Sequence, residues 1–189
     1  MSDKPVAAGH SSFDLIDTEK AFALIDVKTD SRFLDLACGF GHYSIEASAR
    51  IGERGVVYAV DLWQEGIDAL KREIAKRGIK NIKPIVADIR TELPIEEGSV
   101  DSCLLATILH DLSRSDQEST LQEIDRLVKP GGMLTVIEFK KIDRGPGPPV
   151  NIRMEEGEIG ALVIRYGFDK VAGSEVGEFN YLVKYQRIA

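Results

Sequence analysis

The sequence predicts an α/β protein with a mostly parallel sheet and helices on both faces. Short β-branched apolar runs alternate with longer segments of helical periodicity, and the first three runs each reach an aspartate near their carboxyl ends. Parallel strands joined by right-handed crossover helices give this alternation. Two alternating runs at the end of the chain are separated by only two residues, which predicts an antiparallel hairpin.

The length of 189 residues suits one domain over residues 1–189, with residues 1–28 as an N-terminal extension. Within this extension, residues 17–27 have the pattern of an amphipathic helix. The first strand is expected at 32–36, followed by a glycine-containing turn and a helix over 42–51. The second strand, 55–60, leads into a helix over 64–77 that Gly78 ends.

The second half of the chain continues the alternation. Strands are expected at 82–87 and 99–107, and Ser115 with Glu118 has the spacing of a capping box for the next helix. That helix is expected to end at the Lys-Pro-Gly-Gly sequence of 129–132, before a fifth strand over 133–139. A helix around 154–166 and a hairpin of strands 168–176 and 179–186 complete the prediction.

Composition and charge limit the classes of partner and compartment. The 24 basic and 31 acidic residues give a net charge of −7, which is poorly suited to nucleic-acid backbones, so no nucleic-acid partner is expected. No stretch approaches the roughly 20 apolar residues of a membrane span, and no secretory signal is recognisable. Cys38 and Cys103 lie in apolar surroundings and are expected to be buried thiols. We therefore expect a cytoplasmic protein that uses no metal and inserts into no membrane, and we leave a homo-oligomer open.

Three acidic residues point to a ligand site at one edge of the sheet. Asp35, Asp61 and Asp88 follow three consecutive strands at their carboxyl ends, where open α/β sheets bind ligands. The turn after the first strand contains Gly39 and Gly41, which let the backbone approach a ligand at a helix N-terminus. A carboxylate after the second strand can accept two hydrogen bonds from a ribose diol. These residues predict a nucleoside cofactor.

The spacing alone leaves a nicotinamide dinucleotide open. Gly39, Gly41 and Ser44, with Asp61 as the ribose acid, nearly match the dinucleotide-binding fingerprint. Against this interpretation, a dehydrogenase usually needs a second domain or a longer chain for its substrate, and here a hairpin ends the chain soon after the fifth strand.

The motifs together resemble those of the S-adenosylmethionine-dependent methyltransferases with a Rossmann-like fold. The resemblance rests on FLDLACGFG at 33–41, Val-Asp at 60–61, Ala-Asp-Ile at 87–89 and LVKPGG at 127–132, in the order and spacing of that family. It covers roughly residues 15–185 and is greatest to small methyltransferases akin to the ubiquinone and menaquinone type. It implies a seven-stranded, mostly parallel sheet that ends in an antiparallel hairpin, and S-adenosylmethionine as cofactor.

The resemblance also implies roles for individual residues. Asp35, Ala37 and Gly39 would lie around the methionine part of the cofactor and Gly41 would shape the turn, with Ala106 lining the methionine side. Asp61 would hold the ribose hydroxyls, and Leu62, Asp88 and Ile89 would surround the adenine. Ala37 stands where the family usually has glycine; its methyl group is tolerable if its φ is negative.

The expected reaction is methyl transfer to a small-molecule acceptor by in-line displacement. His110 follows the fourth strand and is the candidate general base, although a structural role in the loop is an equal alternative. A nicotinamide-dependent oxidoreductase and a non-catalytic S-adenosylmethionine-binding subunit are the alternatives to a methyltransferase.

Overall fold

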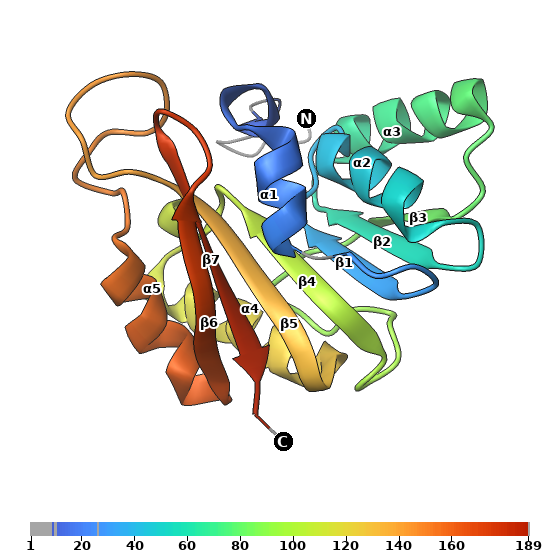
Figure 1. Ribbon diagram of the computed structural model, residues 1–189. Helices are drawn as coiled ribbons and strands as arrows, with labels where there is room; N and C mark the ends of the chain where they lie inside the picture. The colour runs from blue at the N-terminus through green and yellow to red at the C-terminus, as the bar shows by residue number, and fades with distance from the viewer. Residues whose placement is uncertain (1–8, 10, 26, 189) are drawn as a thin grey trace.

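The computed structural model describes residues 9, 11–25 and 27–188. Its seven strands form one sheet in the order β3-β2-β1-β4-β5-β7-β6 (Figure 1). The strands and helices, in chain order, are α1 (Thr18–Ile25), β1 (Arg32–Leu36), α2 (His42–Ile51), β2 (Val56–Asp61), α3 (Gln64–Arg77), β3 (Ile82–Val86), β4 (Val100–Ala106), α4 (Arg114–Leu127), β5 (Val128–Phe139), α5 (Glu156–Val163), β6 (Phe168–Glu175) and β7 (Asn180–Arg187). Short 3₁₀ turns lie at Phe13–Leu15, Leu109–Asp111 and Ile164–Tyr166.

The sheet is parallel except at its C-terminal side. β1 pairs with β2 and β4, β2 with β3, and β4 with β5, all in parallel, whereas β7 runs antiparallel to both β5 and β6. The predicted fold class and the terminal hairpin are therefore confirmed. Because the strand order changes direction at β1 and β4, the turns after these two strands diverge and open a crevice at their carboxyl ends.

Alternate residues of the central strands face two separate cores. Phe33 and Leu104 pack with apolar residues of α1, α2 and α3 on one face. Leu34 and Leu105 pack with residues of α4 and α5 on the other face. This period of two, with both faces covered, explains why the strands read as continuous apolar runs in the sequence.

Two predicted boundaries were wrong, each for a local reason. α4 begins two residues earlier than the capping box at Ser115 indicated, because the Oγ of Ser113 accepts the N–H of Asp116 at 3.2 Å. A capping box is instead present at Glu155 and Glu158, at the start of α5. The Lys-Pro-Gly-Gly sequence does not separate α4 from β5: Val128 already pairs with Val100, and a bulge in the ladder accommodates the glycines.

The predicted N-terminal helix is present as α1, while residue 26 of its predicted range lies outside the described residues. Among the described residues, no helix is long and apolar enough to cross a membrane. In Figure 1, the segment before α1 lies at the same end of the sheet as the loop after β5 and the β6–β7 turn. Contacts agree with this view, since the N–H of Asp17 donates to the carbonyl of Val176 at 2.6 Å.

Candidate active site

A cavity of about 250 Å³ lies at the carboxyl ends of β1, β2 and β4. It brings together seven of the ten site residues expected from the sequence: Ala37, Gly39, Asp61, Leu62, Asp88, Ile89 and Ala106. The other lining residues are Gly9, Trp63, Arg90, Thr107, Ile108 and Leu112. Three expected residues, Asp35, Gly41 and His110, are not in the lining.

The carboxylate of Asp61 is fixed by the turns that follow β1 and β2. Its Oδ2 accepts the N–H of Gly39 at 2.7 Å, and its Oδ1 accepts the N–H of Trp63 at 2.8 Å. Since a carboxylate oxygen has two lone pairs, each oxygen retains one acceptor position. The side chain is thus held in a single orientation with capacity for two further donors.

The two glycines in the turn after β1 have different surroundings. Gly39 and Gly41 both have positive φ, +55° and +75°, a conformation that costs glycine little. A Cβ atom at Gly39 would meet nothing within 4 Å, whereas one at Gly41 would lie 2.6 Å from Cδ1 of Leu70 in α3. Gly41 is therefore required by packing of the turn against α3, and Gly39 leaves open space beside the cavity.

Two non-glycine residues of the lining also have positive φ. Ala37 has a φ of 58° and Thr107 has a φ of 53°, each directly after or beside the end of a central strand. The condition set for Ala37 from the sequence, a negative φ, is not met. Such backbone conformations cost roughly 1–3 kcal/mol in residues other than glycine and concentrate at functional sites.

Asp35 lies beneath the cavity, with only 1% of its surface exposed. Burial raises the pKa of Asp35 to about 7. The hydroxyl of Ser44, which donates to Oδ2 at 2.5 Å, opposes this shift, and the charge of Asp61 adds to it. Burial likewise raises the pKa of the neighbouring Cys38 thiol well above its usual value.

Asp88 is held by an arginine that follows it. The N–H and Nε of Arg90 donate to Oδ1 at 3.0 and 2.8 Å, and Nη2 donates to Oδ2 at 2.6 Å. These hydrogen bonds from Arg90 hold the pKa of Asp88 below its usual value. Leu62 and Ile89 add apolar surface to the same cavity, and half of Leu62 is exposed.

A chain of three hydroxyl groups connects the N-terminal segment to the site. The hydroxyl of Thr107 donates to Oγ of Ser12 at 3.2 Å, and Ser12 lies 2.9 Å from the hydroxyl of Tyr43 in α2. Phe13 packs edge-on against Tyr43, with ring centroids 5.1 Å apart. Since Gly9 belongs to the lining, the segment before α1 covers part of the cavity.

His110 lies in the 3₁₀ turn after β4 and is almost completely buried. Its Nδ1 is 2.7 Å from Oε2 of Glu138 at the end of β5, and its Nε2 is 3.5 Å from Oδ2 of Asp111. Burial alone would lower the pKa of His110, but the bond to Glu138 and the charges of Glu138 and Asp111 raise it overall, against a smaller opposing effect of Arg153.

Sequence reasoning missed several residues of the lining. The segment after β4 contributes Thr107, Ile108 and Leu112, as the segment after β2 contributes Leu62. Their position after a strand could have indicated them. Arg90 could have been predicted from its position two residues after Asp88. Gly9 offered none, because its contact with the site depends on the path of the N-terminal segment.

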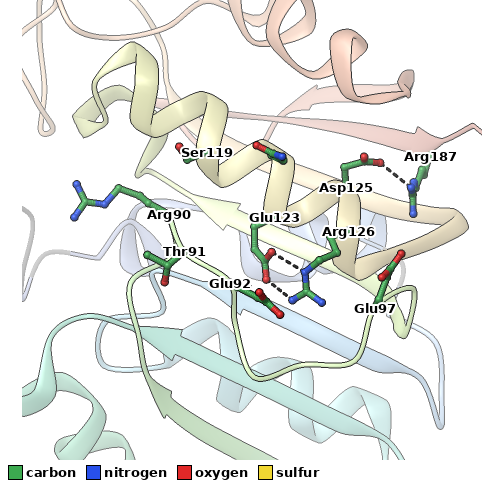
Figure 2. A pocket seen from close by; sticks show the side chains of 10 residues that line it. Arg90, Thr91, Glu92, Glu97, Ser119, Glu123, Asp125, Arg126 and Arg187 are labelled. Carbon is green, nitrogen blue, oxygen red and sulfur yellow. Dashed lines mark hydrogen bonds and ion pairs between the residues drawn. The ribbon is translucent and has the colours of Figure 1, made fainter.

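A second, more open cavity of about 530 Å³ lies between the loop after β3 and α4 (Figure 2). Most residues of its lining carry charged side chains, and several of these form ion pairs. Figure 2 shows Arg126 bonded to Glu123, and Arg187 paired with Asp125 at 2.8 Å. Arg90 lines this cavity as well as the first one.

Comparison with known proteins places these features among relatives. A family model described as a methyltransferase domain matches residues 33–132. A demethylmenaquinone methyltransferase of Bacillus mycoides is 28% identical over 167 residues, which cover 87% of this chain and 65% of the relative. One from Staphylococcus saprophyticus is 31% identical over 60% of this chain and 47% of that protein. This chain thus matches less than two thirds of the length of these relatives.

A solved structure of similar size was also found. The crystal structure of a SAM-dependent methyltransferase from Aquifex aeolicus is 29% identical, with a TM-score of 0.85 over 94% of this chain and 93% of that chain. The similarity therefore extends over the whole sheet, beyond the matched motifs.

Proposed function

Because the chain belongs to the methyltransferase domain family, we propose that it transfers the methyl group of S-adenosylmethionine to a small-molecule acceptor. The observation that carries this proposal is Asp61, whose two oxygens are fixed by backbone N–H groups and keep one acceptor position each. A ribose diol supplies two donors. When bound, S-adenosylmethionine supplies an electrophilic methyl group, which an acceptor lone pair takes up by in-line displacement while the bonding electrons stay on sulfur.

The other residues of the lining fit the remaining parts of this cofactor. We assign the adenine to the region of Leu62, Asp88 and Ile89, where apolar side chains flank a carboxylate acceptor. The methionine part is assigned to the side of Ala37, Gly39 and Ala106, with Asp35 beneath it and Gly41 shaping the turn. The positively charged sulfonium then lies in a cavity that carries two carboxylates, Asp61 and Asp88.

Asp61→Ala tests the placement of the cofactor. Two hydrogen bonds to a charged acceptor are lost, so we expect S-adenosylmethionine to bind about 10- to 100-fold more weakly. Titration calorimetry measures the change, and Asp68→Asn, an exposed pair partner of Lys71 on α3, is the matched control. Unchanged affinity in Asp61→Ala would remove the basis of this assignment.

We propose His110 as the general base when the acceptor must lose a proton. Its position after β4 and its bond to Glu138, which fixes the ring, support this role. Since the base form is neutral, the rate of methyl transfer is expected to rise with pH through the raised pKa of His110.

His110→Ala separates this role from a structural one. Loss of a general base lowers the rate at saturating cofactor and acceptor by about 10²–10⁴. A near-normal rate together with a lowered unfolding midpoint would assign His110 to the stability of the turn after β4.

We further propose that residues 1–189 act as one methyltransferase domain with residues 1–28 as its N-terminal extension, in the cytoplasm and without a nucleic-acid partner. The net charge of −7 and the two free, buried cysteines support this proposal. The names of the curated relatives make a quinone such as demethylmenaquinone the first acceptor to assay.

A further inference from the structure

Arg90 connects the proposed cofactor cavity to the second, charged cavity. Its guanidinium group donates to Asp88 through Nε and Nη2, and its Nη1 lies 3.3 Å from Oδ1 of Asp116 at the start of α4. Figure 2 shows its side chain pointing away from the Glu123–Arg126 pair. Arg90 therefore contacts the first cavity through Asp88, to which it makes three hydrogen bonds, and makes one longer contact to Asp116.

The hydrogen bonds of Arg90 leave Asp88 with little free capacity. A carboxylate offers about four acceptor positions. The N–H, Nε and Nη2 of Arg90 take three of them, two on Oδ1 and one on Oδ2. One position remains, on Oδ2. A single N–H donor of a ligand can fill this acceptor position. A carbonyl oxygen of a ligand in the same place is repelled by the negative charge of the Asp88 carboxylate.

We propose that Arg90 is a positioning residue that fixes Asp88 so that the cavity selects a purine bearing an amino group over one bearing a carbonyl group. This inference rests on the proposed placement of the adenine in the cavity. Arg90 directly follows the Ala-Asp-Ile motif of residues 87–89 and lies two residues after the aspartate that it fixes.

The charges around Asp88 are consistent with this role. Arg90 approaches it from its own loop, Asp116 of α4 lies behind Arg90, and Asp61 at the end of β2 lines the same cavity. The hydrogen bonds from Arg90 hold the pKa of Asp88 below its usual value, which favours the carboxylate, the acceptor form.

The test compares two ligands that differ only in the purine. Binding of S-adenosylhomocysteine and of its deaminated analogue S-inosylhomocysteine is measured by titration calorimetry at neutral pH. The parent is expected to prefer the adenosyl ligand. Arg90→Gln is expected to weaken its binding roughly tenfold and to reduce the preference, because Asp88 is no longer fixed.

Two further variants separate positioning from general effects. Asp116→Asn removes the contact behind Arg90 but keeps the bonds between Arg90 and Asp88, and it is expected to behave as the parent does. Arg90→Lys keeps the charge but not the two-pronged contact, and it is expected to lie between the parent and Arg90→Gln.

The possible failures are distinguishable. If the parent binds neither ligand, the proposed function itself is wrong. If the parent binds S-adenosylhomocysteine and Arg90→Gln binds it equally or more tightly, the positioning role is wrong and Arg90 competes with the ligand. Equal losses for both ligands in Arg90→Gln and in Asp116→Asn would also overturn the inference, since they indicate a general effect of α4.

Discussion

At the scale of single residues, burial in the folded protein changes the protonation of Asp35. The pKa of Asp35 rises from 3.8 to about 7 because the side chain is buried, so the folded state binds the proton more tightly than the unfolded chain does. The stabilising contribution of this proton is complete below the unfolded pKa and is lost as the pH rises through the folded pKa. Between about pH 4 and pH 7, Asp35 therefore makes the free energy of unfolding decrease with pH.

Asp35→Asn is expected to remove this part of the pH dependence. The amide keeps the shape of the protonated acid and an oxygen that accepts the hydroxyl of Ser44. Urea unfolding from pH 4 to 8 measures the free energy of unfolding of variant and parent. The difference between these two free energies is expected to change up to about pH 7 and then stay constant. Asp169→Asn, at an exposed position of β6, is the control. A constant difference across the whole range would contradict the raised pKa.

At the scale of elements, a buried arginine holds the loop between β5 and α5. Arg153 is 5% exposed, and its guanidinium group donates to four backbone carbonyl groups of this loop: Lys140 at 3.0 Å, Ile142 at 2.9 Å, Pro146 at 3.2 Å and Pro148 at 2.9 Å. Lys141 and Arg144 lie within the segment that these bonds enclose. This one side chain therefore connects four points along the loop.

Arg153→Met is expected to release this loop while filling most of the space of the side chain. Cleavage by trypsin after Lys141 and Arg144 is expected to become faster, and stability is expected to fall by about 1–3 kcal/mol as the carbonyl groups lose their donor. Limited proteolysis followed by mass spectrometry measures the cleavage sites. Arg165→Met, which removes an exposed partner of Glu118, is the control. Equal cleavage rates in parent and Arg153→Met would show that the loop is held by other contacts.

At the scale of the whole molecule, binding of the correct cofactor stabilises the entire fold. The cavity joins turns that follow β1, β2 and β4, the strands that form the centre of the sheet. A ligand present at 100 times its dissociation constant adds about 2.7 kcal/mol to the free energy of unfolding. We expect S-adenosylhomocysteine to raise the unfolding midpoint and NAD to leave it unchanged. A shift with NAD alone would favour the oxidoreductase that the glycine spacing left open.

The sequence predicted the sheet well because its evidence is repeated along the chain. Each strand supplied its own apolar run, and every connection between parallel strands except that from β3 to β4 supplied a helical period. An error at one boundary therefore did not change the topology. The start of α4 was less certain because Ser113 and Ser115 both precede an acidic residue by three positions, and only the folded chain selects Ser113.

The site was predicted less completely than the fold. Residues directly after strands were found because the ends of parallel strands meet at one edge of the sheet. The positive φ of Ala37 could not be predicted, since the backbone of alanine usually adopts the right-handed helical or the extended conformation, both with negative φ. His110 contacts Glu138, 28 residues further along the chain, and no local pattern indicates that contact.

The burial of Cys38 has a consequence for the chemistry beside it. Cys38 stands between Ala37 and Gly39 in the sequence, two residues of the cavity lining, but its side chain packs in the core beside α1, α2 and α3. Burial keeps the pKa of its thiol well above the usual value. Thiolates, and not thiols, attack electrophilic carbon. A methyl sulfonium reacts with thiolates, so a buried, neutral thiol is the unreactive form of cysteine for a residue next to the cofactor cavity that we propose. The fold thus leaves the methyl group of the proposed cofactor to the acceptor.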